Sequence, residues 1–210
     1  MKPIHSDTAA PPWDDLSTRP PAWTSDAGAV RFENPWLQLV EYAATAPTGH
    51  PAQFGVVRFK NRAVGVLPLH EDGTVVLVGQ HRFPRANYSW EMPEGGAPFD
   101  EAPLDGARRE LREEAGLDAA HWREALTMEL SNSVTDEEAV CYLAWGLTSA
   151  AAAPDPTESL AIARVPFRAL LAEAAAGRIQ DALTVATAFR AYHMAREGEL
   201  PQGLARAMLG

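Results

Sequence analysis

The sequence predicts an α/β protein that starts with strands and ends with helices. Segments rich in β-branched and aromatic residues recur between residues 31 and 147, with turn residues between them. One amphipathic helix is expected inside this run of strands, and two more helices close the chain. The composition, 46% hydrophobic and 22% charged, suffices for a packed core and excludes wholesale disorder.

The first part of the chain is expected to differ from the rest. Residues 1–27 contain repeated prolines and are interpreted as a Pro-rich N-terminal arm without regular structure. Residues 28–62 are expected to form N-terminal strands, and residues 63–198 the main domain with the C-terminal helices. Residues 199–210 are expected to be a tail. The length of 210 residues fits one large domain with an arm.

The strands are predicted in chain order from composition and turn signals. The turn Ala46-Pro47-Thr48-Gly49 separates the first two, and a hairpin turn at Glu71-Asp72-Gly73 joins a later pair. The predicted strands span residues 31–42, 54–62, 63–69, 74–79, 126–130, 140–147 and 162–165. The predicted strand that ends at residue 79 and the one that begins at residue 126 flank a segment rich in charged residues.

Two helices are predicted after a low-complexity Ala/Pro loop at residues 149–156. The first runs from Phe167 to Ala176, where Gly177 provides a C-terminal stop. The second begins after Asp181, which is a favourable N-cap residue.

Charge and composition exclude several classes of protein. The chain has 18 basic and 28 acidic residues, whereas nucleic-acid binders usually carry a basic surface, so no nucleic-acid partner is expected. No run approaches the ~18 apolar residues of a membrane span, and the N-terminus lacks the apolar stretch of a signal peptide. The single cysteine, Cys141, excludes an internal disulfide. We therefore expect a cytoplasmic protein without a membrane partner.

The internal helix places three carboxylates on one face. Pro103 suits its first turn and Gly116 suits its C-terminal stop. At about 100° per residue, Glu110, Glu113 and Glu114 fall within one arc, apart from the apolar stripe. Like charges at these spacings repel, and carboxylate oxygens are the ligands that Mg²⁺ and Mn²⁺ prefer. The pattern indicates a divalent metal site, and the alternative is a solvated acidic face.

A wider pattern surrounds this helix. The sequence from residue 95 to residue 117 fits Gly-x5-Glu-x7-Arg-Glu-U-x-Glu-Glu-x-Gly-U, where U is aliphatic, at every fixed position. This pattern is the Nudix box, so the chain resembles the Nudix hydrolases. The matching residues are Gly95, Glu101, Arg109, Glu110, Leu111, Glu113, Glu114, Gly116 and Leu117.

The resemblance implies an α/β/α sandwich with a mixed central sheet, preceded by an N-terminal β arm or subdomain. It also implies Mg²⁺- or Mn²⁺-dependent cleavage of a nucleoside diphosphate linked to another group. By motif position, the metal ligands would be Glu110, Glu113 and Glu114, with the main-chain carbonyl of Glu94 as a further ligand. The residues that support the box would be Gly95, Glu101, Arg109 and Gly116, with Glu101 and Arg109 forming an ion pair.

Motifs outside the box are similar to those of the ADP-ribose pyrophosphatase branch. They lie at residues 34–36, 78–84, 89–96 and 179–184. This resemblance implies a nucleoside diphosphate sugar as substrate, with ADP-ribose first, and a homodimer formed through the N-terminal strands. Asn132 departs from the branch, which usually has a proline there, so GDP-mannose and ADP-glucose stay open as alternative substrates.

Substrate-binding residues are expected near the box. Arg82 would hold a phosphate or ribose through its forked donors, although a surface salt bridge is an equal alternative. Trp90 would stack on a base or belong to the core, and Glu91 would support the metal site or make a strand-end hydrogen bond. Glu137 is expected to contact substrate or to support the metal.

The general base is less strongly specified. The resemblance favours a glutamate in the loop after the strand that follows the box, and Glu158 fits that place. Glu137 is the second candidate, and Glu114 could itself activate water, so Glu113, Glu114 and Glu158 are taken as the catalytic set. A non-catalytic, ligand-binding Nudix domain is the alternative of a different class, and the intact box carboxylates argue against it.

Overall fold

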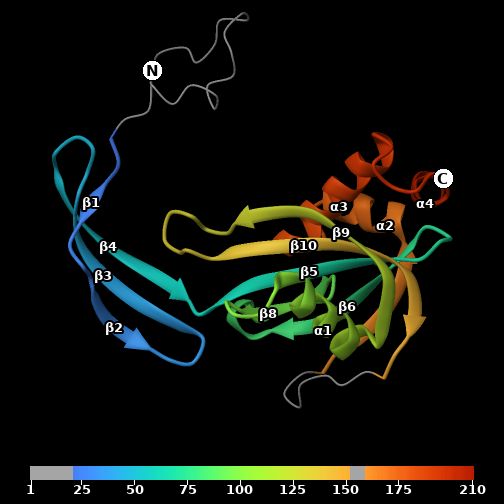
Figure 1. The fold of residues 1–210 in the computed structure, drawn as a ribbon, viewed down its shortest axis with the longest axis horizontal. Helices are drawn as coiled ribbons and strands as arrows, with labels where there is room; N and C mark the ends of the chain where they lie inside the picture. Colours follow the sequence, from blue (N-terminus) through green and yellow to red (C-terminus); the bar gives the residue numbers. More distant parts are fainter. Residues whose placement is uncertain (1–20, 152–158) are drawn as a thin grey trace, which may run out of the picture.

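The computed structural model describes residues 21–151 and 159–210, which form two β-sheets and four α-helices (Figure 1). A four-stranded sheet near the N-terminus projects from one end of the main body, which consists of a seven-stranded sheet and the helices. Within these two ranges, no helix combines the length and the apolar character needed to cross a bilayer.

The N-terminal sheet is antiparallel, and its central strand pairs with all three others. Its strands are β1 (Thr24–Ser25), β2 (Ala29–Glu33), β3 (Leu37–Thr45) and β4 (Pro51–Phe59). The ring of Trp23 packs edge-on against that of Phe54, with centroids 5.0 Å apart. The described end of the predicted arm therefore lies on its own chain, and the expectation that it has no regular structure is wrong at β1.

The prediction of one strand over residues 31–42 is wrong, because a turn at Asn34 divides it into β2 and β3. The side-chain Oδ1 of Asn34 accepts hydrogen bonds from the backbone N–H groups of Trp36 and Leu37, both at 2.9 Å. Asparagine commonly makes such turns, and the following Pro35 has no N–H to offer a strand.

The main sheet contains seven strands in the order β11-β6-β5-β10-β9, with β7 paired to β6 and β8 paired to β5. Its strands are β5 (Asn61–Leu69), β6 (Thr74–Arg82), β7 (Asn87–Glu91), β8 (Glu94–Pro98), β9 (Leu117–Glu129), β10 (Glu138–Ser149) and β11 (Ala161–Pro166). The pair β5–β10 is parallel and the other pairs are antiparallel. The sheet is therefore mixed, as predicted.

The chain passes from the first sheet to the second at Lys60, between β4 and β5. The predicted strand over residues 54–62 therefore spans parts of two strands that belong to different sheets. The backbone N–H of Lys60 donates to the carbonyl of Trp36 at 2.9 Å, which directs the chain out of the N-terminal sheet.

Helices cover both faces of the main sheet, which confirms the α/β/α sandwich (Figure 1). Helix α1 (Pro103–Ala115) packs on one face against Val64, Val66, Val140 and Tyr142. Because side chains alternate along a strand, the intervening residues of β5 and β10 point to the other face. There they meet α2 (Phe167–Ala175), α3 (Ala182–Arg196) and α4 (Gln202–Leu209).

The last helix lies in the segment that we expected to be a tail. Helix α4 falls within residues 199–210, and its residues Leu204 and Met208 are buried in the core beneath the sheet. The sequence signal was weak because the helix is short and follows directly on Pro201. Its apolar face nevertheless completes the helical layer, which joins it to the main domain.

A loop of the main domain, residues 131–137, is tied to the N-terminal sheet. The backbone N–H of Val57 in β4 donates to the carbonyl of Val134 at 2.9 Å. Asp136 accepts from the backbone N–H of Phe59 at 3.0 Å and pairs with Arg58 at 3.1 Å. Besides the chain itself at Lys60, the two sheets are thus joined a second time through this loop.

Candidate active site

Helix α1 begins and ends at the residues that its sequence predicts. Pro103 occupies the first turn, where its missing N–H costs no hydrogen bond. Gly116 ends the helix in the left-handed conformation, with φ at +61°, and its N–H donates to the carbonyl of Arg112. The helix therefore has fixed ends, and its carboxylate face has a defined direction.

That face points into the protein instead of into solvent. Glu110 and Glu114 are only 8% and 4% exposed, while Glu113 is half-buried. Oε2 of Glu114 accepts a hydrogen bond from the backbone N–H of Glu94 at 2.9 Å. The solvated acidic face that we considered as an alternative is thus excluded for two of the three carboxylates.

Gly95 provides the space that Glu110 occupies. A Cβ at residue 95 would lie 2.6 Å from Oε2 of Glu110 and still closer to its Cδ and Oε1. Every side chain larger than hydrogen would displace the carboxylate. The glycine at this box position is therefore required by the close approach of Glu110.

Arg109 holds the carboxylates together. Its Nη1 lies 2.6 Å from Oε1 of Glu110 and 3.0 Å from Oε2 of Glu113, and its Nη2 donates to the carbonyl of Gly96 at 2.7 Å. Nη2 also lies 3.5 Å from Oε2 of Glu101, so the expected ion pair is present. Burial lowers the pKa of Arg109, but its pairing with Glu110 and Glu113 outweighs this and raises it.

Gly106 packs tightly against β8 on the opposite side of the helix from open solvent. A Cβ there would lie 2.7 Å from Cβ of Ala97 and 3.2 Å from Oε2 of Glu101. The structure therefore gives this glycine a role in close packing. It allows α1 to approach the strand that carries Gly95.

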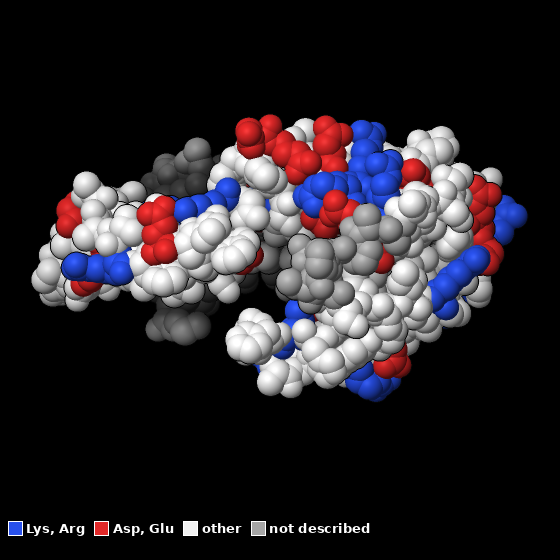
Figure 2. All heavy atoms as spheres, turned by 90° about the horizontal axis from the view of Figure 1, so that it is seen from below, with Lys and Arg blue, Asp and Glu red and all other residues white. Residues whose placement is uncertain are grey.

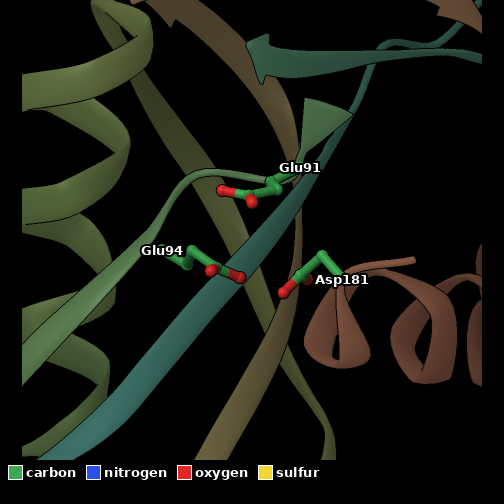
Figure 3. Close-up of side chains that lie close together, drawn as sticks. All are labelled: Glu91, Glu94 and Asp181. Carbon is green, nitrogen blue, oxygen red and sulfur yellow. The ribbon is translucent and has the colours of Figure 1, made fainter. Parts of the chain in front are cut away.

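A second acidic cluster lies beside the box (Figure 3). Glu91 at the end of β7, Glu94 at the start of β8 and Asp181 before α3 have carboxylate oxygens within 4.8 Å of one another. Arg82 bridges two of them, with its Nη2 2.5 Å from Oε2 of Glu91 and 2.8 Å from Oε1 of Glu94. Arg82 is thus paired to buried carboxylates, while its expected role toward substrate stays a prediction.

The charge of this cluster is only partly compensated. Burial raises the pKa of Glu94 well above its usual value, and the nearby carboxylates of Asp181 and Glu91 raise it further. Within the described residues, the buried Oε2 of Glu94 accepts no hydrogen bond. For Arg82, burial lowers the pKa, but its hydrogen bond to Glu91 and the nearby carboxylates outweigh this and raise it. A proton or a cation is therefore favoured next to Glu94.

Sequence reasoning identified Asp181 only as a helix cap. Its Oδ2 does accept from the backbone N–H of Thr184 at 2.7 Å, which confirms the cap. The hydroxyl of Thr184 in turn accepts from the backbone N–H of Met92 at 2.9 Å, so α3 is anchored to the loop between Glu91 and Glu94. Residues 90 positions apart carry no local signal of such proximity, and only the fold brings them together.

Two adjoining cavities lie at this junction. The inner lobe, of about 280 Å³, is lined by Ala63, Arg82, Glu94, Gly95, Leu130, Glu137, Asp181, Ala182 and Leu183. The outer lobe, of about 450 Å³, is lined by Arg82, Pro84, Arg85, Asn87, Ser89, Glu91, Glu94, Gln180, Asp181 and Ala182. The lobes share Arg82, Glu94, Asp181 and Ala182, so together they form one cleft that starts at the box.

The remaining predicted residues lie at different places relative to the cleft. Glu137 lines the inner lobe, where burial and then the charge of Asp136 raise its pKa. Trp90 lines neither lobe and packs against the core on the far face of β7. Glu158, the first candidate for the base, lies outside the described residues.

Charged side chains are mixed on the face of the molecule drawn in Figure 2. Lysines and arginines lie among aspartates and glutamates there, and the largest group of basic side chains is bordered by acidic ones.

Comparisons with known proteins agree with the geometry of the site. The NUDIX domain family matches residues 59–186. The chain is 35% identical over 86 residues to an ADP-ribose pyrophosphatase of Mycobacterium tuberculosis, a match that covers 40% of this chain and 42% of the relative. It is 39% identical over 61 residues to an RNA pyrophosphohydrolase of Bartonella henselae, covering 27% and 35% of the two chains. The chain therefore spans less than half the length of these relatives.

Two longer matches extend the comparison. A methanol dehydrogenase activator of Bacillus methanolicus is 29% identical over 141 residues, which covers 66% of this chain and 76% of that protein. The crystal structure of an ADP compounds hydrolase superposes with a TM-score of 0.77 at 17% identity, covering 88% of this chain and 100% of the other. At this identity the structural likeness concerns the fold.

Proposed function

The chain belongs to the NUDIX domain family, and from this premise we propose that it is a divalent-metal-dependent pyrophosphatase for a nucleoside diphosphate sugar. The first candidate substrate is ADP-ribose, which would give AMP and ribose 5-phosphate. The observation that carries the proposal is the arrangement of three carboxylates on α1: Glu110 lies against Gly95, Glu114 accepts from the backbone N–H of Glu94, and Arg109 lies between Glu110 and Glu113. The similarity to an ADP-ribose pyrophosphatase supports this choice of substrate.

The donor set fits a hard divalent cation. The three glutamates on one face of α1 offer only oxygen atoms as ligands, and two of these side chains are buried. Nearby, the buried Oε2 of Glu94 accepts no hydrogen bond within the described residues. We propose that Glu110, Glu113 and Glu114 hold Mg²⁺ or Mn²⁺, together with the main-chain carbonyl of Glu94. When bound, such an ion supplies neutralisation of the pyrophosphate oxygens and a lowered pKa of a water molecule.

The protein groups prepare this chemistry by orientation. Arg109 fixes the rotamers of Glu110 and Glu113, and the backbone N–H of Glu94 fixes Glu114. Preorganised carboxylates lose little entropy when the substrate arrives. We propose Gly95 and Glu101 as further supports, since Gly95 makes room for Glu110 and Glu101 pairs with Arg109.

A proton acceptor is needed for the attacking water. Glu137 lines the inner lobe together with Gly95, and its raised pKa brings it closer to the operating pH than an ordinary glutamate. We propose Glu137 as one candidate base beside Glu158 and Glu114. Variants of each, measured over a range of pH, separate them.

We also propose that the protein is a homodimer formed through the N-terminal sheet. Large apolar side chains are exposed on this sheet, and a monomer rarely exposes several together. They are Val30, Phe32, Trp36 and Leu39. Light scattering coupled to gel filtration gives the mass directly, and a mass of one chain, 22.7 kDa, over the working concentration range would contradict the dimer.

The proposed activity is tested by coupling a phosphatase to the reaction and measuring phosphate release. The panel contains ADP-ribose, ADP-glucose, GDP-mannose, diadenosine polyphosphates and a 5′-triphosphorylated RNA, each with and without Mg²⁺ or Mn²⁺. We expect metal-dependent turnover that is fastest with ADP-ribose. Fastest turnover of ADP-glucose or GDP-mannose would keep the reaction and change the substrate, and the RNA arm tests the likeness to RNA pyrophosphohydrolases.

The controls separate loss of catalysis from loss of fold. Glu113→Gln removes a proposed metal ligand, and Glu124→Gln makes the same change at an exposed glutamate of β9. Only the first is expected to lose activity. Absence of turnover with every compound, in a folded protein that still binds ADP-ribose, would favour a non-catalytic binding domain.

A further inference from the structure

We infer that the outer lobe of the cleft binds the sugar half of the substrate, and that Asn87, Ser89 and Gln180 determine which sugar is accepted. The inference rests on the proposed function, because it assigns one half of a nucleoside diphosphate sugar to a cavity beside the box.

The two lobes have the size and continuity that a two-part substrate needs. The outer lobe, of about 450 Å³, lies within the range of roughly 300–1,000 Å³ that is usual for small-molecule sites. The inner lobe, of about 280 Å³, includes Gly95 and so adjoins the proposed metal site. The shared boundary at Arg82 and Glu94 therefore separates the reacting phosphates from the group beyond them.

The polar lining of the outer lobe is built into the hairpin of β6 and β7. Asn87, Ser89 and Glu91 are alternate residues of β7 and share one face of the strand. Arg82 is the direct cross-strand partner of Asn87, so it lies on the same face. This row of polar side chains is the face of β7 that is turned to the lobe, because the other face of the strand packs on the protein.

The aromatic residues of β7 occupy that other face. Tyr88 packs edge-on against His81 and Trp90, with ring centroids 5.0 and 5.7 Å away. Gly79 leaves the space for both rings, because a Cβ there would lie 2.9 Å from ring atoms of Trp90. These rings lie on the face of β7 away from the lobe, and none of the described residues that line the outer lobe is aromatic.

This lining suits hydroxyl groups better than a base or a second phosphate. A nucleobase gains much of its affinity from stacking on an aromatic ring, which the lobe lacks. A further phosphate would meet two guanidinium groups in the lobe but three carboxylates, so the acidic side chains outnumber the basic ones there. Sugar hydroxyls donate to carboxylates and accept from guanidinium and amide groups, so they can use both kinds of partner.

Gln180 also lines the outer lobe, and it belongs to the segment before α3 and not to the β6–β7 hairpin. It precedes Asp181 at the start of α3, and its Nε2 donates to the carbonyl of Gly177 at 3.1 Å, which restrains its amide. Asn87 and Gln180 are both exposed, so their truncation should leave the fold intact. They are therefore the residues with which the inference is best tested.

The test measures equilibrium binding of ribose 5-phosphate and, separately, of AMP to the full chain by calorimetry in the presence of Mg²⁺. The double variant Asn87→Ala/Gln180→Ala is compared with wild type and with Gln202→Ala, a matched change at an exposed glutamine of α4. We expect about tenfold weaker binding of ribose 5-phosphate to the double variant, as loss of two hydrogen bonds gives, and unchanged binding of AMP.

Each outcome of these binding measurements either supports or overturns the assignment of the outer lobe to the sugar. Weaker AMP binding with unchanged ribose 5-phosphate binding would overturn the inference, because the lobe would then hold the nucleoside half. Unchanged binding of both ligands, or no binding of ribose 5-phosphate to wild type, would also overturn it. If the sugar phosphate binds through Asn87 and Gln180 while wild type hydrolyses no nucleotide sugar, the sugar lobe stands and the proposed function fails.

Discussion

Replacing Gly95 by alanine tests the metal site without touching a carboxylate. The added Cβ would lie 2.6 Å from Oε2 of Glu110, whereas ordinary contacts start near 3.4 Å. The carboxylate must therefore move by about 1 Å, a displacement that typically costs about 100-fold in rate, or about 2.7 kcal/mol of transition-state stabilisation. Because Arg109 clamps the same carboxylate, it cannot swing away freely.

The assay is kcat/KM for ADP-ribose as a function of Mg²⁺ concentration, with circular dichroism to check the fold. Gly96→Ala is the matched control, because its added Cβ would collide with the side-chain amide of Asn61 and not with a carboxylate. We expect Gly95→Ala to lose about 100-fold and to need more metal, while Gly96→Ala loses far less. Wild-type kinetics for Gly95→Ala would refute the placement of Glu110 at the metal.

Further predictions concern Glu113, Glu137 and Thr184. Glu113→Gln should lower kcat at least about 100-fold with an unchanged circular dichroism spectrum, and wild-type turnover would contradict its role as a ligand. For Glu137, whose pKa is raised by burial, kcat/KM should rise as pH passes above that pKa, and Glu137→Gln should flatten this limb of the pH profile. The carboxyl group of Glu137 has a higher pKa in the folded protein than in the unfolded chain, so its ionisation destabilises the folded protein as pH rises above about 4.5. Glu137→Gln should therefore raise Tm at pH 8 but not at pH 4. Thr184→Val leaves the buried N–H of Met92 without its acceptor and should cost about 1–3 kcal/mol in urea unfolding, whereas Thr184→Ser should stay close to wild type.

Local chemistry explains which elements were predictable. Helix α1 was predicted to the residue because Pro103 and Gly116 act within its own turns, and Asp181 was identified as a cap for the same reason. Strand ends were less accurate, since they depend on partners distant in sequence. Strand β9, for example, begins at Leu117, well before the predicted start at residue 126, because β10 pairs with it along its length.

The candidate site was predictable where a spacing encodes it. The helical spacing of Glu110, Glu113 and Glu114 placed them on one face, but not the burial of that face against β8. The cluster that includes Asp181 and the polar row that begins at Asn87 depend on how the hairpin and α3 meet. Such contacts between distant segments leave no periodic trace in a single sequence.

The hydrogen bonds between residues 134–136 and β4 limit how this protein can be recombined with its relatives. Transplanting only the N-terminal sheet from another family member would keep the backbone N–H donors at positions 57 and 59, but it would remove the ion pair between Arg58 and Asp136 wherever the relative lacks that arginine. Chimeras that exchange the sheet together with residues 131–137 should retain activity, whereas chimeras split at Lys60 alone should be less active where the donor sheet lacks that arginine. The N-terminal sheet and the loop at residues 131–137 are therefore best exchanged together, although they are far apart in the sequence.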